Sequence, residues 1–198
     1  MSLRYWVGAG GNFGDAANWS DSSGGTGGYS VPDEYCLVYF NGAGGGCTVD
    51  ASVGILGFSA SADYTGTIAQ NKSVAIYSDA TFGGGVFQGD GTDVTVLGSL
   101  SLAGGTIHTK ISVYGDVLCG AGFGSWTPLN DATVSMESTR EQRIVTGGIL
   151  PTLIVDKTGT SNQVKVFGSY GTLNINGDLM INSGFLDSKK HNIQVGSM

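Results

Sequence analysis

The chain of 198 residues has the length of a single domain, with 35 glycines and a charged fraction of only 13%. Its net charge of −7 argues against a nucleic-acid partner, because such binding relies on a basic surface that neutralises phosphates. No apolar run reaches the ~20 residues of a membrane-spanning helix, so we expect no membrane span. The apolar residues alternate instead of following a helical period, which predicts an all-β fold.

The first 36 residues are expected to form an N-terminal cap. They contain six aromatic side chains among Gly, Ser, Asn and Asp: Tyr5, Trp6, Phe13, Trp19, Tyr29 and Tyr35. Stacked β-structures expose strand edges at their ends, and large aromatic side chains cover such ends at low entropic cost. Sugar binding by the same aromatics is the alternative interpretation.

Strands are expected at residues 36–40, 47–50, 54–58 and 64–68, where β-branched and aromatic residues lie between glycine-rich turns. Cys36 and Cys47 flank the glycine-rich stretch 41–46, so they could face each other across a hairpin. A disulfide between them stays open, because a reducing cytosol would keep both thiols free. No CxxC or Cys/His cluster indicates a zinc site.

Four stretches follow one fourteen-residue pattern, at residues 74–87, 94–107, 111–124 and 173–186. Apolar residues occupy the first, third, seventh and ninth places, and small Ala80 is the one weakly apolar exception. Glycine always occupies the twelfth place. Alternation with period two puts these side chains on one face of a strand. Two short strands and a corner, restarting after about 20 residues, predict a single-stranded parallel β-solenoid (β-helix) over residues 37–198. Cys119 takes the ninth place and is expected to be a buried hydrophobe.

The sixth place holds Asp79, Ser99, Asp116 and Asp178. In a solenoid, residues at the same place of the pattern lie above one another in successive coils. Asp79, Ser99 and Asp116 are therefore expected to line one corner. Such a column could bind calcium or act on sugar, but the exchange of aspartate for serine favours ordinary turn residues. The stretch 89–93 resembles a calcium loop only weakly, since it lacks the spaced ligands and closing glutamate of an EF-hand. We therefore predict no metal site.

Residues 125–163 break the repeat and are expected to form irregular coils, with short strands at 125–129, 133–136, 140–145 and 150–155 and a bulge or looser corners. The pattern resumes at 164–167, and a further copy begins at Ile193 and stops. We expect either a fragment or a partner, such as a trimer, that covers this end. Roughly seven to nine coils spaced ~4.8 Å apart would make a body about 35–45 Å long.

No catalytic constellation is evident. His108 and His191 have no second ligand at metal spacing and no nucleophile motif nearby, so both are expected at the surface. Solenoids that cleave polysaccharides need carboxylates about 5–10 Å apart, which distant coils could still bring together. The cationic candidates have no acid in matching register; they are Lys110, Arg140, Arg143 and Lys165. The sequence predicts no enzyme, no catalytic residues and no cofactor.

Residues 5–20 and 24–40 resemble the opening of β-solenoid modules found in phage virion proteins and in bacterial surface proteins, including autotransporter passengers. That pattern reads aromatic-Gly, Gly-Asn-Trp, Asn-Trp-Ser, then Val-Pro and a strand ending in an aromatic residue; here Phe13 replaces the first tryptophan. Residues 142–184 are similar to repeats common in the same proteins. The resemblance covers most of the chain and implies the architecture, while it specifies function poorly.

The resemblance implies two competing settings. An adhesin should carry a leader, whereas a phage structural protein assembles in the host cytoplasm, and a chain entering the cap pattern soon after Met1 favours the virion. The leading hypothesis is a non-enzymatic phage structural protein, either a capsid decoration (cement) protein or a tail-fibre or spike module, forming a homotrimer with contacts to other virion subunits. The alternative is a bacterial surface adhesin or carbohydrate-binding β-solenoid that contacts host polysaccharide. A polysaccharide depolymerase comes third.

Overall fold

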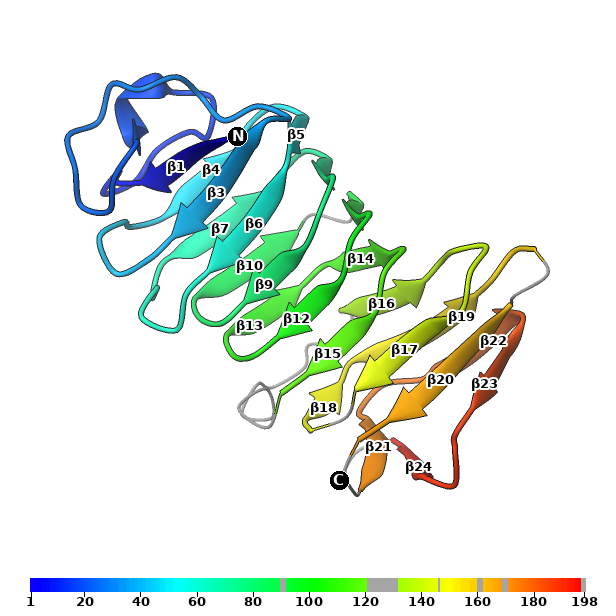
Figure 1. Ribbon diagram of the computed structural model, residues 1–198. Helices are drawn as coiled ribbons and strands as arrows, with labels where there is room; N and C mark the ends of the chain where they lie inside the picture. The colour runs from blue at the N-terminus through cyan, green and yellow to red at the C-terminus, as the bar shows by residue number, and fades with distance from the viewer. Residues whose placement is uncertain (90–91, 121–131, 146, 160–161, 169–170, 197–198) are drawn as a thin grey trace.

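Figure 1 shows the computed structural model, which describes residues 1–89, 92–120, 132–145, 147–159, 162–168 and 171–196. The fold is all-β, and successive coils stack along one axis into a solenoid of about seven turns. The two ends of the chain lie toward opposite ends of this axis. The predicted fold class, a parallel β-solenoid, is confirmed.

Within these described ranges, strands from successive coils lie side by side in four sheets. Sheet A contains, in spatial order, β2 (Trp19–Ser20), β1 (Ser2–Trp6), β3 (Cys36–Phe40), β6 (Gly57–Ala60), β9 (Ala80–Phe82), β12 (Leu100–Leu102), β15 (Val117–Cys119), β17 (Gln142–Val145), β20 (Gln163–Phe167) and β23 (Phe185–Asp187). Sheet B contains β13 (Thr106–His108), β10 (Val86–Gly89), β7 (Thr67–Gln70) and β4 (Cys47–Val49). Sheet C contains β22 (Leu179–Ser183), β19 (Thr152–Asp156), β16 (Thr133–Met136), β14 (Lys110–Val113), β11 (Val94–Val96), β8 (Val74–Ile76) and β5 (Val53–Ile55). Sheet D contains β18 (Ile149–Leu150), β21 (Thr172–Ile175) and β24 (Asn192–Val195).

Where the coils are described in full, each visits sheet C, then sheet A and then a third side, which sheet B forms in the early coils and sheet D in the later ones. Apart from one shift in register between β19 and β22, neighbouring coils pair in parallel and residue for residue, so Val74 lies beside Val94, and Val94 beside Ile111. Parallel pairing without a shift keeps equal places of the pattern in one column. The fourteen-residue pattern thereby becomes a set of columns that run along the axis.

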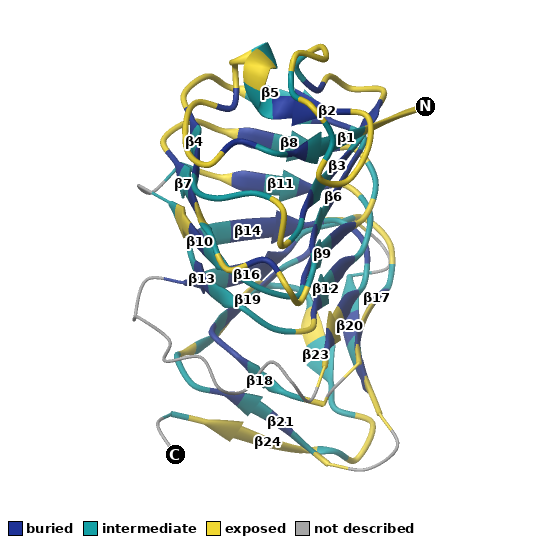
Figure 2. Ribbon diagram, turned by 90° about the vertical axis from the view of Figure 1, so that its left-hand side faces the viewer, coloured by how far each residue is buried: buried dark blue, intermediate teal, exposed yellow. Residues whose placement is uncertain are grey.

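The interior of the solenoid consists of apolar columns built from the alternating places of the pattern. On sheet C one buried column contains Ile55, Ile76, Val96, Val113, Met136 and Val155. On sheet A another contains Phe40, Ala60, Phe82, Leu102 and Cys119. Cys119 is 4% exposed, which confirms the prediction of a buried hydrophobe. Figure 2 shows the alternation of buried and less buried residues along the strands, as expected when one face of each sheet meets the core.

The N-terminal segment covers the exposed edges of the first coil. β1 extends sheet A beside β3, and β2 pairs with β1 in the antiparallel direction. Residues 8–13 lie along the outer edge of β4, where the N–H of Thr48 donates to the Gly11 carbonyl and its own carbonyl accepts from Phe13. A 3-10 helix, η1 (Ala16–Asn18), follows. Backbone groups that would otherwise be unpaired at this end are satisfied within the chain.

Aromatic side chains fill the space beneath this covering segment. Trp6, Phe13 and Trp19 are buried, and the ring of Trp19 lies 5.1 Å from Trp6 and 4.8 Å from Phe13, both in edge-on contacts. The indole N–H of Trp19 donates to the Phe13 carbonyl at 2.7 Å. The other aromatics of the segment do not share this position, since Tyr29 and Tyr35 are exposed.

Several expected strand boundaries are wrong because the chain turns more often than the pattern indicates. The strand expected at 54–58 divides at Leu56, where the chain passes from sheet C to sheet A. The strand expected at 64–68 begins only at Thr67, and the strand expected at 150–155 is interrupted at Pro151, which has no N–H to donate. Each of the first two copies of the pattern has a third strand after its twelfth-place glycine. These strands are β10 and β13, and the predicted two-strand unit did not include them.

The hairpin considered possible between Cys36 and Cys47 does not form. β3 and β4 belong to sheets A and B, on two sides of the solenoid, and both thiols are free. The stretch 125–163 pairs in parallel with its neighbours where it is described, with one shift in register between Val155 and Asp156. The strand expected at 125–129 and the twelfth-place Gly122 lie outside the described residues, as does Asp90 of the calcium-like stretch.

The fourth copy of the pattern occupies a different side of the solenoid from the first three. Copies 74–87, 94–107 and 111–124 begin on sheet C, whereas copy 173–186 begins on sheet D and reaches sheet C with its second strand. Its ninth-place residue, Ile181, pairs with Val155 of the buried column on sheet C, and it is 48% exposed because β22 is the edge strand of that sheet. The pattern therefore encodes strand, corner and strand, and it does not encode which side of the solenoid they form.

Candidate functional site

The sixth-place residues form a hydrogen-bonded ladder at the corner between sheets C and A. The Asp79 carboxylate accepts from the backbone N–H of Ser99 at 2.8 Å, and the Ser99 hydroxyl accepts from the N–H of Asp116 at 3.4 Å. The Asp116 carboxylate in turn accepts from the N–H of Arg143 at 2.8 Å. Each side chain thus bonds the backbone of the next coil, which assigns the column a structural role in the corner.

Asp178 does not join this ladder. It follows β21 and precedes β22, so it lies at the corner between sheets D and C. Its backbone N–H donates to the hydroxyl of Thr152 at 3.2 Å, and its own side chain is exposed. The hydrogen bonds agree with the expectation that Asp79, Ser99 and Asp116 line one corner. Asp178, at the same place of the fourth copy, lies at a different corner.

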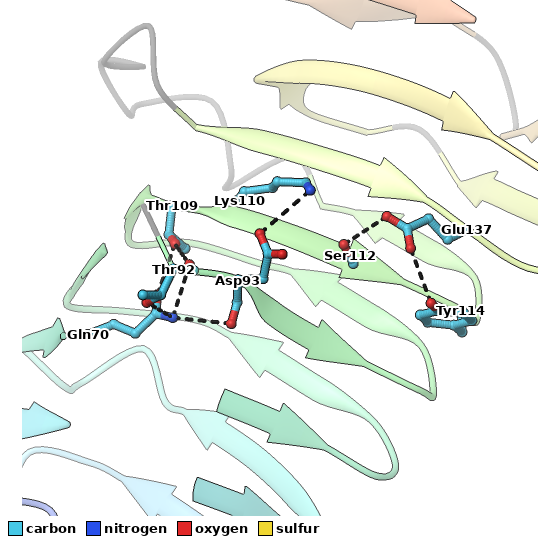
Figure 3. Close-up of polar contacts among 8 residues, drawn as sticks. All are labelled: Gln70, Thr92, Asp93, Thr109, Lys110, Ser112, Tyr114 and Glu137. Carbon is cyan, nitrogen blue, oxygen red and sulfur yellow. Dashed lines mark hydrogen bonds and ion pairs between the residues drawn. The ribbon is translucent and has the colours of Figure 1, made fainter. Parts of the chain in front are cut away.

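A second polar group lies where the strands of sheet C end. Figure 3 shows Glu137 between two hydroxyl donors, the Ser112 Oγ at 2.8 Å and the Tyr114 Oη at 3.1 Å. Burial, together with the neighbouring Glu137 carboxylate, raises the pKa of Tyr114, so its hydroxyl remains a donor across the physiological range. The next coil adds Asp156, whose Oδ1 accepts from the Ser183 hydroxyl at 2.9 Å.

These residues surround a hollow of about 370 Å³, here called the Glu137 hollow. It is lined by Tyr114, Glu137, Ser138, Thr139, Asp156 and Thr158. The lining comes from three successive coils, because Tyr114 follows β14, Glu137 follows β16 and Asp156 ends β19. The hollow combines two carboxylates, three aliphatic hydroxyls and one phenol, and no cationic side chain lines it.

A third polar group lies between sheets B and C. Gln70 is fully buried, and its amide donates to the Thr92 hydroxyl at 2.9 Å while its Oε1 accepts from the Thr109 hydroxyl at 2.9 Å (Figure 3). Nearby, the ammonium of Lys110 lies 3.5 Å from the Asp93 carboxylate. The interior amide is satisfied by its neighbours, which indicates a structural role.

The expectation that the cationic candidates have no acid in register is wrong for Lys110 and Lys165, and no ion pair of Arg140 or Arg143 is found among the described residues. Lys110 pairs with Asp93, and Lys165 pairs with Glu141, which lowers the pKa of the Glu141 carboxyl. The guanidinium of Arg143 lies 5.2 Å from the centre of the Phe167 ring. The parallel register brings Arg143 beside Lys165 on the outer face of sheet A.

The two histidines differ from each other. His108 is half-buried instead of fully exposed, and its Nδ1 is buried with no hydrogen-bond partner among the described residues. His191 is half-buried, and its Nδ1 lies 2.9 Å from the Ser188 carbonyl. Within the described ranges, no three His, Cys, Asp or Glu side chains come together in a group that could hold a metal ion.

Sequence reasoning missed the Glu137 hollow. Tyr114 falls in a matched copy of the pattern, but Glu137 and Asp156 lie in the stretch that departs from it, and the coils between them differ in length. Among the described residues, no helix has the length and apolar character needed to cross a membrane. The chain matches no family model, no curated protein and no solved structure.

Proposed function

We propose that the protein is a non-enzymatic structural protein of a phage particle, either a capsid decoration protein or a tail-fibre or spike module. It acts by protein–protein contacts with other virion subunits and assembles as a homotrimer in the host cytoplasm. The resemblance of residues 5–20 and 24–40 to virion solenoids supports this setting. The solenoid itself supports a mechanical role, because its long parallel sheets and continuous core make a stiff body.

The observation that carries the proposal is an apolar row on the outer face of sheet A. Leu118 pairs with Val145, and Val145 pairs with Phe167, so the three side chains form one column across adjacent strands. They are 42%, 39% and 36% exposed, respectively. Contiguous exposed apolar side chains mark interaction surfaces in soluble proteins. Lateral contact through this row would bring solenoids side by side.

Light scattering during size-exclusion chromatography tests the assembly. We expect a particle of three times 20.2 kDa for the wild-type chain and a shift toward the monomer for Val145→Lys. Ser101→Lys is the matched control, because Ser101 occupies the same outer column one strand before Leu118. A wild-type monomer at high concentration, or equal effects of the two lysines, would overturn the lateral contact.

The virion setting has its own test. Antibodies against the purified chain should detect it in gradient-purified phage particles released from the source culture, and the envelope fraction of uninfected cells should lack it. Detection in the envelope fraction alone would instead favour the second candidate, a bacterial surface adhesin or carbohydrate-binding solenoid. The polar lining of the Glu137 hollow favours that candidate. Sustained release of reducing ends from host polysaccharide would contradict the non-enzymatic assignment.

A further inference from the structure

We propose that the Glu137 hollow binds one neutral sugar unit of a polysaccharide. This inference rests on the second of the two proposed functions and assigns it a site and a ligand class. The hollow, at about 370 Å³, falls at the lower end of the size range of ligand pockets, which suits a single sugar ring.

The lining selects among ligand classes by its chemistry. Glu137 and Asp156 would repel an anion, and no lysine, arginine or histidine lines the hollow to offset them. The apolar part of the lining consists of the Tyr114 ring, the threonine methyls and side-chain methylenes, without any larger aliphatic side chain. A neutral ligand rich in hydroxyls fits, since it can donate to carboxylates and accept from the hydroxyls of Ser138, Thr139 and Thr158.

Both carboxylates keep acceptor capacity for such a ligand. Each Glu137 oxygen accepts one hydroxyl, from Ser112 or from Tyr114, and an ionised carboxylate offers about four lone-pair sites. Asp156 receives the Ser183 hydroxyl at one oxygen. The three ion pairs formed by the described residues involve neither Glu137 nor Asp156. Hydrogen bonds to a charged acceptor are the stronger ones, so two carboxylates can orient one sugar ring.

The buried Gln142 and Lys157 side chains connect two walls of the hollow. The Gln142 amide donates to the carbonyls of Val113 and Gly115, which flank Tyr114, at 2.9 and 2.5 Å. The Gln142 Oε1 accepts from the Nζ of Lys157, which lies between Asp156 and Thr158 in the chain. The wall that carries Tyr114 is therefore tied to the wall that carries Asp156. A site held in advance by its support loses little affinity to ordering on binding.

Titration of the ¹⁵N-labelled full chain with methyl glycosides tests the proposal. The probes are the methyl glycosides of glucose, galactose, mannose and N-acetylglucosamine, each followed by amide chemical shifts. We expect at least one to bind, with shifts centred on Tyr114, Ser138, Thr139 and Thr158. Glu137→Gln should weaken binding about tenfold, because it replaces a charged acceptor by a neutral one of the same shape.

Two further variants distinguish a specific loss of binding at the hollow from a general loss of structure. Thr139→Trp fills the hollow and should abolish binding while the spectrum outside the hollow stays unchanged. Asp178→Asn is the matched control, since it neutralises an exposed carboxylate at another corner, and it should bind like the wild type. Absence of binding by all four glycosides, shifts centred elsewhere, or shifts produced by calcium alone would overturn the proposal.

The outcome of the assembly test is independent of the outcome of the glycoside-binding test. Light scattering on the same samples reports whether Val145→Lys changes the particle mass, and that residue lies on sheet A, outside the lining of the hollow. A monomeric wild-type chain that still binds glycoside would refute the lateral contact alone. An intact trimer without glycoside binding would refute the sugar site alone.

Discussion

Lys157 and Gln142 form a buried pair in which the lysine Nζ donates to the Gln142 Oε1 at 2.6 Å. The same Nζ donates to the carbonyl of Arg140 at 2.5 Å. Lys157 is only 2% exposed, and burial, assisted by the charge of Arg140, lowers its pKa to about 8. The pair joins three coils inside a largely apolar core, so the ammonium is held by hydrogen bonds but disfavoured as a cation.

This pair predicts an alkaline rise in stability that depends on Lys157. Between about pH 8 and pH 10.5 the folded lysine has lost its proton, while the lysine of the unfolded chain still carries one. The unfolded state then binds more protons, so the free energy of unfolding rises with pH, by up to about 3 kcal/mol across the window. Urea unfolding of the wild type at a series of pH values measures the rise.

Lys157→Met is the control for this rise. The buried thiols act in the opposite direction above pH ~9, because folding raises their pKa, but they are common to both proteins and cancel in the difference. We expect the difference in unfolding free energy between wild type and variant to increase from pH ~8 upward. Parallel pH profiles for the two proteins would contradict the assignment.

The cysteines predict slow thiol chemistry in the folded protein. Cys47 and Cys119 are 3% and 4% exposed, and burial raises the pKa of both thiols, that of Cys119 to about 12. Reaction with Ellman's reagent requires the thiolate, so at pH ~8 these two thiols should react on the order of a thousandfold more slowly than in denaturant. All three thiols should titrate after unfolding without reductant, because Cys36 and Cys47 are free. A single reactive thiol in denaturant would reveal a disulfide.

The regular part of the fold could be predicted because parallel stacking converts a sequence place into a spatial column. The twelfth-place glycines illustrate this: Gly85, Gly105 and Gly184 have positive φ angles of 69°, 76° and 82°. Glycine adopts this conformation without strain, whereas most other residues rarely do, so the requirement is visible in the sequence. The ladder from Asp79 to Asp116 is visible for the same reason, since equal places meet in adjacent coils.

The position of the fourth copy, the buried polar contacts and the Glu137 hollow could not be predicted, because they depend on how many residues each coil contains. Asp178 shares its place with Asp79, yet it occupies another corner, since the chain reaches it after coils of different length. Gln70, Gln142 and Lys157 are buried polar residues whose partners lie in other coils, and the sequence does not mark those partners. The Glu137 hollow is formed by three coils in the same way.

The ladder predicts unequal effects of two aspartates that share one place in the pattern. Asp79→Ala removes the acceptor of the Ser99 N–H and should lower the free energy of unfolding by about 1–2 kcal/mol. Asp79→Asn keeps an oxygen acceptor and should cost less. Asp178→Ala should stay within about 0.5 kcal/mol, because its exposed carboxylate forms no hydrogen bond with the described residues. Urea unfolding compares the three, and equal losses for the two alanines would contradict the ladder.

The twelfth-place glycines predict a large cost for one added methyl group. Gly105 has a φ of 76°, and a Cβ there would lie 2.8 Å from the Gly84 carbonyl oxygen of the preceding coil. Gly105→Ala should therefore lose about 2–4 kcal/mol, from left-handed backbone strain and from this contact. Gly120→Ala is the matched control, because its nearest neighbour would be the Leu102 carbonyl oxygen at 3.4 Å. We expect Gly120→Ala to stay within about 0.5 kcal/mol of the wild type, and an equal loss at both positions would mean that stacking does not impose the glycine.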